Sequence, residues 1–158
     1  MPSSMQKFMK VNQKKEENYF LPVTKTLTEE VEERDKKGNI VKVQKPILWE
    51  FKVLDSEYCE QIKKDYEKEV PIVDKKKGIT TYRTKFDGNG YLIRLAIESC
   101  VMPNLRDVEL QNSYGVQGEE ELLYAMVPKP GEFSQLLVDI QQKLGFTDLY
   151  EDVAEAKN

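Results

Sequence analysis

The hydrophobic period changes along this chain, and that change constrains the fold more than any other feature. Between residues 23 and 54 apolar residues recur at about every second position, which is typical of strands. After residue 87 they recur three or four positions apart, which is typical of helices. The sequence therefore predicts an α+β fold, with an N-terminal antiparallel β-hairpin or small sheet followed by a mainly helical C-terminal part.

A hairpin is predicted within the first of these regions. The turn-forming run Asp35-Lys36-Lys37-Gly38-Asn39 separates two β-prone runs. Farther along, Ile47, Trp49, Phe51 and Val53 occupy alternate positions, as in a strand with one buried face. We expect a two- or three-stranded antiparallel sheet with Trp49 in its core.

One amphipathic helix is predicted over residues 55–70 and is expected to pack on this sheet. Asp55 or Ser56 can cap its N-terminus. Its apolar side chains fall four positions apart before Pro71 ends the run, at Tyr58, Ile62, Tyr66 and Val70. Residues 72–86 are ambiguous: Lys75-Lys76-Lys77-Gly78 is predicted to be a turn, while residues 79–84 remain open between a short strand and an extended loop.

The remaining chain predicts a bundle of helices and, at the other end, an arm. Residues 88–100 carry the widest apolar stripe, which indicates the central and most buried helix. The expected organisation is a flexible N-terminal arm over residues 1–22 and a single α+β domain over 23–158, the latter with strands over 23–54, a helix over 55–70 and a helical bundle over 87–158.

Apolar side chains near both ends of the chain are candidate contacts for a partner protein. The arm is otherwise polar, so its aromatic residues either pack on the body or dock onto another protein. The candidate partner-binding residues are Phe8, Tyr19, Phe20, Leu149, Tyr150 and Val153.

Charge and hydropathy argue against two classes of partner. The 24 basic and 28 acidic residues give a net charge of −4, which provides no general field for a phosphate backbone, so nucleic acid is not expected as a partner. No run approaches the roughly 20 apolar residues that a membrane helix needs, and residues 1–7 lack the apolar core of a signal peptide. We therefore expect no membrane contact and a cytoplasmic location in a bacterial host.

Cys59 and Cys100 are isolated and are expected to be reduced core thiols.

The chain contains no histidine, which removes the commonest acid/base catalyst and zinc ligand. No catalytic or cofactor-binding motif is recognisable, so no catalytic residue, cofactor or metal ligand is assigned. Asp87, Asn89 and Glu98 have the spacing of a calcium-binding loop, but Tyr91 and Leu92 occupy the positions that need an oxygen ligand and a glycine. The expectation is a protein that is not an enzyme, with a metal-dependent enzyme as a remote alternative.

Several short motifs in the C-terminal third give the most specific signal. They are, in order, Pro103-Asn104-Leu105-Arg106-Asp107, residues 109–116, Pro130-Gly131-Glu132, Leu144-Gly145-Phe146 and Glu155-Ala156-Lys157-Asn158. In this order they resemble the XkdN-like tail assembly chaperones of Gram-positive phages and prophages. Lys129 departs from the family pattern, which has an apolar residue at that position.

The resemblance implies a chaperone that binds the long, helical tape measure protein, promotes assembly of the major tail tube protein around it, and is absent from the mature virion. It also implies a possible homo-oligomer and a longer isoform made by ribosomal frameshifting. The residues Ala156-Lys157-Asn158 can be encoded by a slippery heptamer, A AAA AAC, and the alternative for these residues is a plain polar C-terminus. The alternative function is a minor structural tail protein, such as a completion or connector protein.

Overall fold

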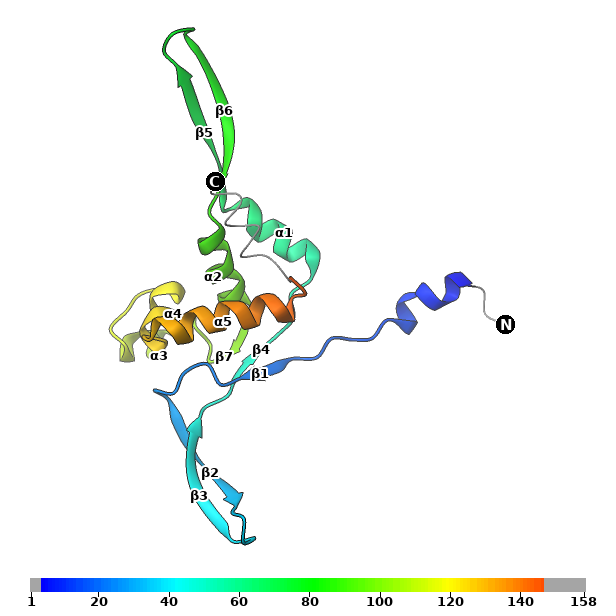
Figure 1. The fold of residues 1–158 in the computed structure, drawn as a ribbon, viewed down its shortest axis with the longest axis vertical. Coiled ribbons are helices and arrows are strands. Elements are labelled where there is room, and N and C mark those ends of the chain that lie inside the picture. The colour runs from blue at the N-terminus through cyan, green and yellow to red at the C-terminus, as the bar shows by residue number, and fades with distance from the viewer. Residues whose placement is uncertain (1–3, 147–158) are drawn as a thin grey trace.

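The computed structural model describes residues 4–146, which combine helices with small antiparallel sheets and so confirm the α+β class. A compact group of helices lies in the middle, two β-hairpins project from it in opposite directions, and the N-terminal segment extends to one side (Figure 1). The strands are β1 (Tyr19–Leu21), β2 (Thr28–Arg34), β3 (Ile40–Pro46), β4 (Trp49–Phe51), β5 (Glu67–Asp74), β6 (Ile79–Phe86) and β7 (Cys100–Met102). The helices are α1 (Ser56–Lys64), α2 (Gly88–Ser99), α3 (Val108–Ser113), α4 (Glu119–Met126) and α5 (Pro130–Lys143), with short 3₁₀ helices at η1 (Ser4–Phe8) and η2 (Lys10–Asn12).

Helix α2 forms the centre of the core, as its wide apolar stripe predicts. It contacts α1, α4, α5 and strand β7, and Leu95 near its middle is completely buried. Asp87 caps its N-terminus, where the carboxylate Oδ1 accepts a hydrogen bond from the backbone N–H of Gly90 at 3.0 Å. Helices α3, α4 and α5 lie in the region predicted as a helical bundle, and residues 147–158 of that region lie outside the described residues. Helix α5 ends before Gly145, whose positive φ of 84° suits a residue without a side chain.

Three strands form the sheet that packs on these helices, in the order β1-β4-β7. Trp49 and Phe51 of β4 face the core and are each 1% exposed, which confirms the prediction for Trp49. The ring of Tyr19 on β1 stacks on Phe51 with 5.6 Å between centroids. This sheet brings together segments that lie about 80 residues apart in the sequence, because β1 and β7 both pair with β4.

The two hairpins are separate two-stranded sheets. The β2–β3 turn is the one predicted at residues 35–39, and its Asp35 carboxylate accepts hydrogen bonds from the backbone N–H groups of Lys37 and Asn39. The hairpin formed by β5 and β6 turns through Lys75-Lys76-Lys77-Gly78 and settles the open question over residues 72–86 in favour of a strand.

Three expectations about the elements were wrong. The helix expected over residues 55–70 ends at Lys64, because Val70-Pro71-Ile72-Val73 pairs with β6 and this long-range pairing outweighs the local four-residue spacing. The helix α1 packs mainly on α2 rather than on the sheet. The strand of Trp49 also does not join the predicted hairpin, since it pairs with β1 and β7.

The two cysteines meet the expectation of reduced core thiols only in part. Both Cys59 and Cys100 are free thiols, and Cys59 is buried. Cys100 begins β7 rather than ending a helix, and burial raises the pKa of its thiol to about 12. Among the helices of residues 4–146, none is both long and apolar enough to cross a membrane.

Candidate partner-binding surfaces

The outer face of the three-stranded sheet carries a row of exposed apolar side chains. Phe20 of β1 lies opposite Glu50, and Glu50 lies opposite Met102 of β7, so these side chains share one face. Phe20 is 57% and Met102 is 61% exposed, and Leu48, just before β4, is exposed as well. We call Phe20, Leu48 and Met102 the sheet patch. Its two outer strands are about 10 Å apart, which is the width of one helix.

The N-terminal segment, residues 4–18, presents a second set of apolar side chains and is called the arm. Phe8 is 81% exposed, and three neighbouring apolar residues are also exposed: Met5, Met9 and Val11. The arm leads directly into β1, so it starts at the edge of the sheet patch and extends away from the helical core (Figure 1). Apolar groups in this position face water unless another protein covers them.

The candidate residues predicted from the sequence separate into three groups. Phe8 and Phe20 are exposed and available to a partner. Tyr19 instead faces the core, where the ammonium group of Lys143 lies 5.2 Å from its ring centroid. Leu149, Tyr150 and Val153 lie outside the described residues. Sequence inspection missed Met102 and Leu48, because only the pairing of β1, β4 and β7 places them beside Phe20.

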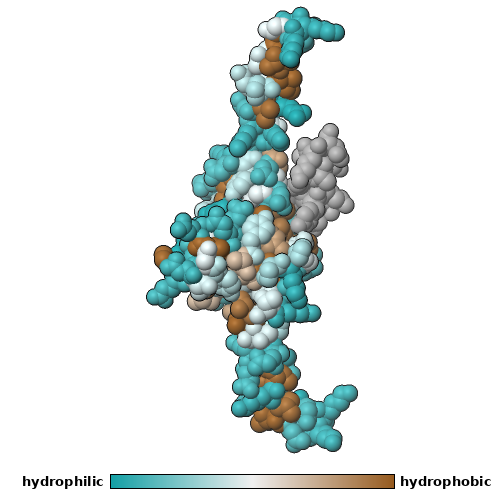
Figure 2. All heavy atoms as spheres, turned by 90° about the vertical axis from the view of Figure 1, so that its left-hand side faces the viewer, coloured by the Kyte–Doolittle hydropathy of each residue, from teal (hydrophilic) through white to brown (hydrophobic). Residues whose placement is uncertain are grey.

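Exposed apolar side chains also lie on both hairpins. Figure 2 shows hydrophobic atoms in brown at the two ends of the molecule, among hydrophilic atoms in teal. The residues concerned are Ile40 and Val41 on β3, and Ile72, Val73, Ile79 and Tyr82 on β5 and β6. Alternation over residues 40–43 predicted a strand, but periodicity alone could not tell that no other element covers it.

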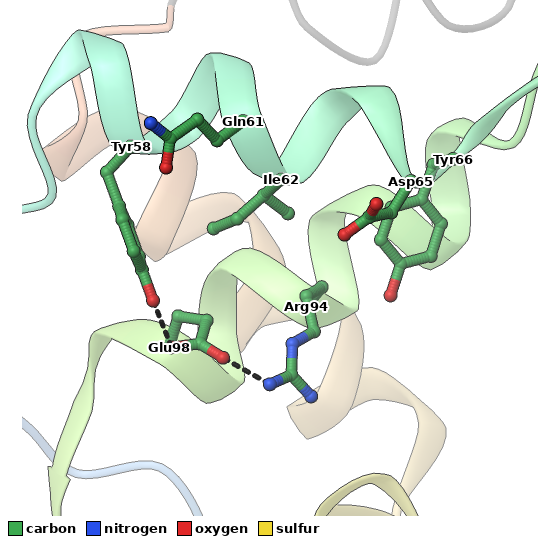
Figure 3. Close-up of a pocket in the computed structure, with 7 residues that line it drawn as sticks. All are labelled: Tyr58, Gln61, Ile62, Asp65, Tyr66, Arg94 and Glu98. Carbon is green, nitrogen blue, oxygen red and sulfur yellow. Dashed lines mark hydrogen bonds and ion pairs between the residues drawn. The ribbon is translucent and has the colours of Figure 1, made fainter.

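A polar pocket of about 440 Å³ lies between α1 and α2. Figure 3 shows Tyr58 of α1 pointing at Glu98 of α2, to which its hydroxyl donates a hydrogen bond of 2.6 Å. Arg94, one turn earlier on α2, forms an ion pair with the same carboxylate. Ile62, Gln61, Asp65 and Tyr66 complete the lining.

Two further charges extend this contact into a network. Arg106 lies 3.3 Å from Glu98 and 3.2 Å from Glu119, and Arg94 lies 3.7 Å from Glu119. The four charged side chains therefore connect α2, the segment before α3, and the start of α4. We call Tyr58, Arg94, Glu98, Arg106 and Glu119 the polar network.

The protonation states in the pocket do not favour acid/base catalysis. Burial opposes ionisation of Glu98, but the hydrogen bond from Tyr58 and the charges of Arg94 and Arg106 outweigh it and lower the pKa of the carboxyl. The same hydrogen bond raises the pKa of Tyr58. A general base at neutral pH needs a raised carboxyl pKa, and a nucleophilic tyrosine needs a lowered one. The polar network therefore stabilises the contacts between these helices.

Asp87 and Glu98, which with Asn89 have the spacing of a calcium-binding loop, do not come together. Asp87 caps the start of α2 and Glu98 lies near its end, so a helix of that length separates them by about 16 Å. Within residues 4–146, no group of three or more Cys, Asp or Glu side chains has the arrangement of a metal site.

Residues of the C-terminal motifs hold the fold together. Asn104 accepts a hydrogen bond from the backbone N–H of Arg106, and Asp107 caps α3 through the backbone N–H of Leu110. Glu132 accepts hydrogen bonds from the backbone N–H of Lys25 at 2.8 Å and from the hydroxyl of Thr24 at 2.9 Å. The bond from Lys25 is the main reason that the pKa of Glu132 is lowered. These contacts tie the start of α5 to the segment between β1 and β2.

Comparison with known proteins gives three findings. A family described as phage XkdN-like tail assembly chaperone protein matches residues 5–157. The protein YqbN of Bacillus subtilis strain 168, which is described as uncharacterized, is 29% identical over 145 residues that cover 88% of this chain and 90% of that protein. A crystal structure of YqbN has a TM-score of 0.61 to this chain, at 19% identity, and covers 93% of this chain and 100% of that one, which shows that the fold is shared.

Proposed function

Because the chain belongs to the XkdN-like phage tail assembly chaperone family, we propose that it binds the tape measure protein of its phage and promotes assembly of the tail tube around it. The observation that carries this proposal is the pair of adjoining apolar surfaces, the arm and the sheet patch. A tape measure protein is long and helical, and an amphipathic helix binds through apolar side chains spaced three and four positions apart.

The dimensions and chemistry of the sheet patch support this partner. Phe20 and Met102 lie on the two outer strands, so a helix laid between them contacts both while its polar face stays in water. The arm joins β1 at Tyr19 and carries Phe8, which gives it the reach to cover a helix seated on the patch. Binding by apolar contact requires no catalysis, cofactor or metal.

The other proposed partners follow from the same role. The chaperone acts in the cytoplasm of the bacterial host, where it keeps the tape measure protein available to the major tail tube protein, and it leaves before the virion is complete. A frameshifted isoform would extend the chain beyond Asn158 and add a segment for the tube protein. Residues Leu149, Tyr150 and Val153 remain proposed contacts at that end of the chain.

Co-expression with the tape measure protein of the same phage tests the proposal. A tagged copy of this chain is expected to retain the tape measure protein on an affinity column. The double substitution Phe20→Asp and Met102→Asp removes apolar surface from the sheet patch, and we expect it to abolish retention. Both side chains are exposed, so the fold and its circular dichroism spectrum should not change.

Val108→Asp is the matched control, because Val108 is 67% exposed at the start of α3 and outside both surfaces. This variant is expected to retain the tape measure protein. Loss of retention in all variants, or in none, would count against the sheet patch as the binding surface. Detection of the chain in purified virions would favour the alternative of a minor structural tail protein.

A further inference from the structure

The two hairpins expose apolar and charged side chains that no other element among residues 4–146 covers. The strands β5 and β6 contact each other extensively, and Val73 and Tyr82 of this hairpin are 60% and 66% exposed. Ile40 at the tip of the β2–β3 hairpin is 64% exposed. An isolated two-stranded hairpin is only marginally stable in water, and its outer edges offer unpaired backbone groups to another strand. Both hairpins therefore have the features of pairing sites.

The charges on the two hairpins are complementary. Residues 28–33 of β2 contain four glutamates and no basic residue, whereas residues 75–86, the β5–β6 turn and β6, contain five basic residues and no acidic one. Within the described part of the chain, Glu33 is the glutamate of β2 that has an ion-pair partner, Lys45. None of the five basic residues is ion-paired among residues 4–146. One hairpin edge is thus acidic and the other is basic.

We propose that β2 of one molecule pairs with β6 of a second copy of the chain. Pairing of β2 with β2 would place glutamates opposite glutamates, and pairing of β6 with β6 would place basic residues opposite each other, so the mixed pair is the favourable one. An antiparallel register that sets Glu30 opposite Lys85 of the second copy also sets Glu32 opposite its Arg83. The product is a four-stranded sheet, β3-β2-β6-β5, formed by two molecules.

The positions of the hairpins determine the kind of assembly. They project from opposite ends of the long axis of the molecule (Figure 1), so after one contact the first copy keeps its basic edge free and the second copy keeps its acidic edge free. Such a head-to-tail contact between different surfaces produces open chains or rings rather than closed dimers. The sheet patch and the arm take no part in the contact and stay available to another protein. The inference rests on the hairpins alone and does not depend on the proposed function.

Sedimentation velocity of the purified full chain tests the inference. We expect a series of species larger than a dimer that grows with concentration up to roughly 1 mM, where even a weak edge contact associates. Raising the salt concentration from about 0.05 M to about 0.5 M should dissociate them, because exposed charges are then screened.

Charge reversal identifies the interface. Each of the double variants, E30K/E32K and R83E/K85E, is expected to weaken association about tenfold or more. The first variant has two basic edges and the second has two acidic edges, so mixing the two should restore assembly. The control E16K/E17K changes the charge of the arm by the same amount as the first variant and should assemble like the unaltered chain.

Three results would overturn the proposal. They are a monomer at every concentration, an oligomer that both double variants leave intact, and a failure of the mixed variants to assemble while each remains folded by circular dichroism. Binding of the tape measure protein is a separate readout. If the chain still associates with itself but does not bind the tape measure protein, that result would count against the proposed function alone.

Discussion

At the scale of single residues, the polar network has the strongest local control over stability. The side chain of Glu98 is only 10% exposed, and it receives a hydrogen bond from Tyr58 and charge from Arg94 and Arg106. A buried charge that loses one of its partners is costly, whereas exposed ion pairs contribute little. The contribution of the polar network to stability therefore comes from Glu98 rather than from the number of ion pairs.

Glu98→Gln is expected to lower the free energy of unfolding at pH 7 by about 1–3 kcal/mol, because it removes the negative charge that both arginines share. Glu60→Gln on the exposed side of α1 is the matched control and should change stability by no more than about 0.5 kcal/mol. Denaturant unfolding followed by circular dichroism measures both. Equal effects of the two substitutions would show that the polar network does not stabilise the fold.

The same carboxyl predicts a pH dependence. The pKa of Glu98 in the folded chain lies below its ordinary value of 4.5, so the folded state favours the ionised form. Its contribution is fully present above pH 4.5 and is lost as the pH falls through the folded pKa. The stability difference between the unaltered chain and Glu98→Gln should therefore shrink at acid pH. A difference that stays constant from pH 7 to about pH 3 would contradict the assigned cause.

Two substitutions of Tyr19 on β1 should have different effects on stability. The hydroxyl of Tyr19 is buried and has no hydrogen-bond partner among the described residues, and burial, followed by the charge of Asp139, raises its pKa to about 12. Tyr19→Phe is expected to leave stability unchanged or slightly increased, because it removes an unsatisfied buried group. Tyr19→Ala should cost about 3 kcal/mol or more. Thermal unfolding measures these effects, and a large loss in Tyr19→Phe would reveal a partner for the hydroxyl.

At the scale of elements, the sequence predicted what depends on local pattern and missed what depends on distant pairing. The stripe on residues 88–100 located α2, and the Asp, Gly and Asn residues at 35–39 located a hairpin turn. The spacing of Tyr58, Ile62 and Tyr66 also predicted α1, but the same spacing extended falsely into β5. Pairing with β6 across the turn at residues 75–78 decides the conformation of residues 67–74.

The candidate partner-binding residues show the same difference between what local pattern predicts and what strand pairing decides. Phe8 and Phe20 stand out as aromatic residues in a polar segment, so composition alone identified them. The strand order β1-β4-β7 joins residues 19–21 to residues 100–102, and this order decides that Tyr19 faces the core while Phe20 and Met102 face outward. Alternation within a strand predicts opposite faces, but it does not say which face is covered.

The hairpin formed by β5 and β6 should be removable without loss of the core. Glu69 lies directly opposite Thr84, so an Asn-Gly turn can replace residues 70–83 and close the shortened hairpin. We expect the thermal midpoint to change by no more than about 3 °C, since the deleted residues are mostly exposed. Deletion of residues 1–21 is the contrast, because it removes β1 and Tyr19 and should lower the midpoint much further. A large loss from the hairpin deletion alone would show that β5 and β6 stabilise the core.

At the scale of the whole molecule, the fold combines a well-packed helical core with exposed surfaces that extend well beyond it. The core is formed by α2 and the elements around it, and the C-terminal motifs fasten those elements to one another. The arm, the sheet patch and the two hairpins present apolar side chains outside this core. This arrangement suits the proposed function, in which one surface contacts the tape measure protein while the others remain free to contact neighbouring copies.

The proposed function requires this chain to keep a tape measure protein in solution by covering its apolar helices. The soluble fraction of the tape measure protein can be measured when it is expressed alone, with this chain, and with the Phe20→Asp and Met102→Asp variant. We expect a mostly insoluble protein when it is expressed alone, a mostly soluble one in the presence of the unaltered chain, and no rescue by the variant. A soluble fraction that is the same in all three cultures would contradict the proposed function.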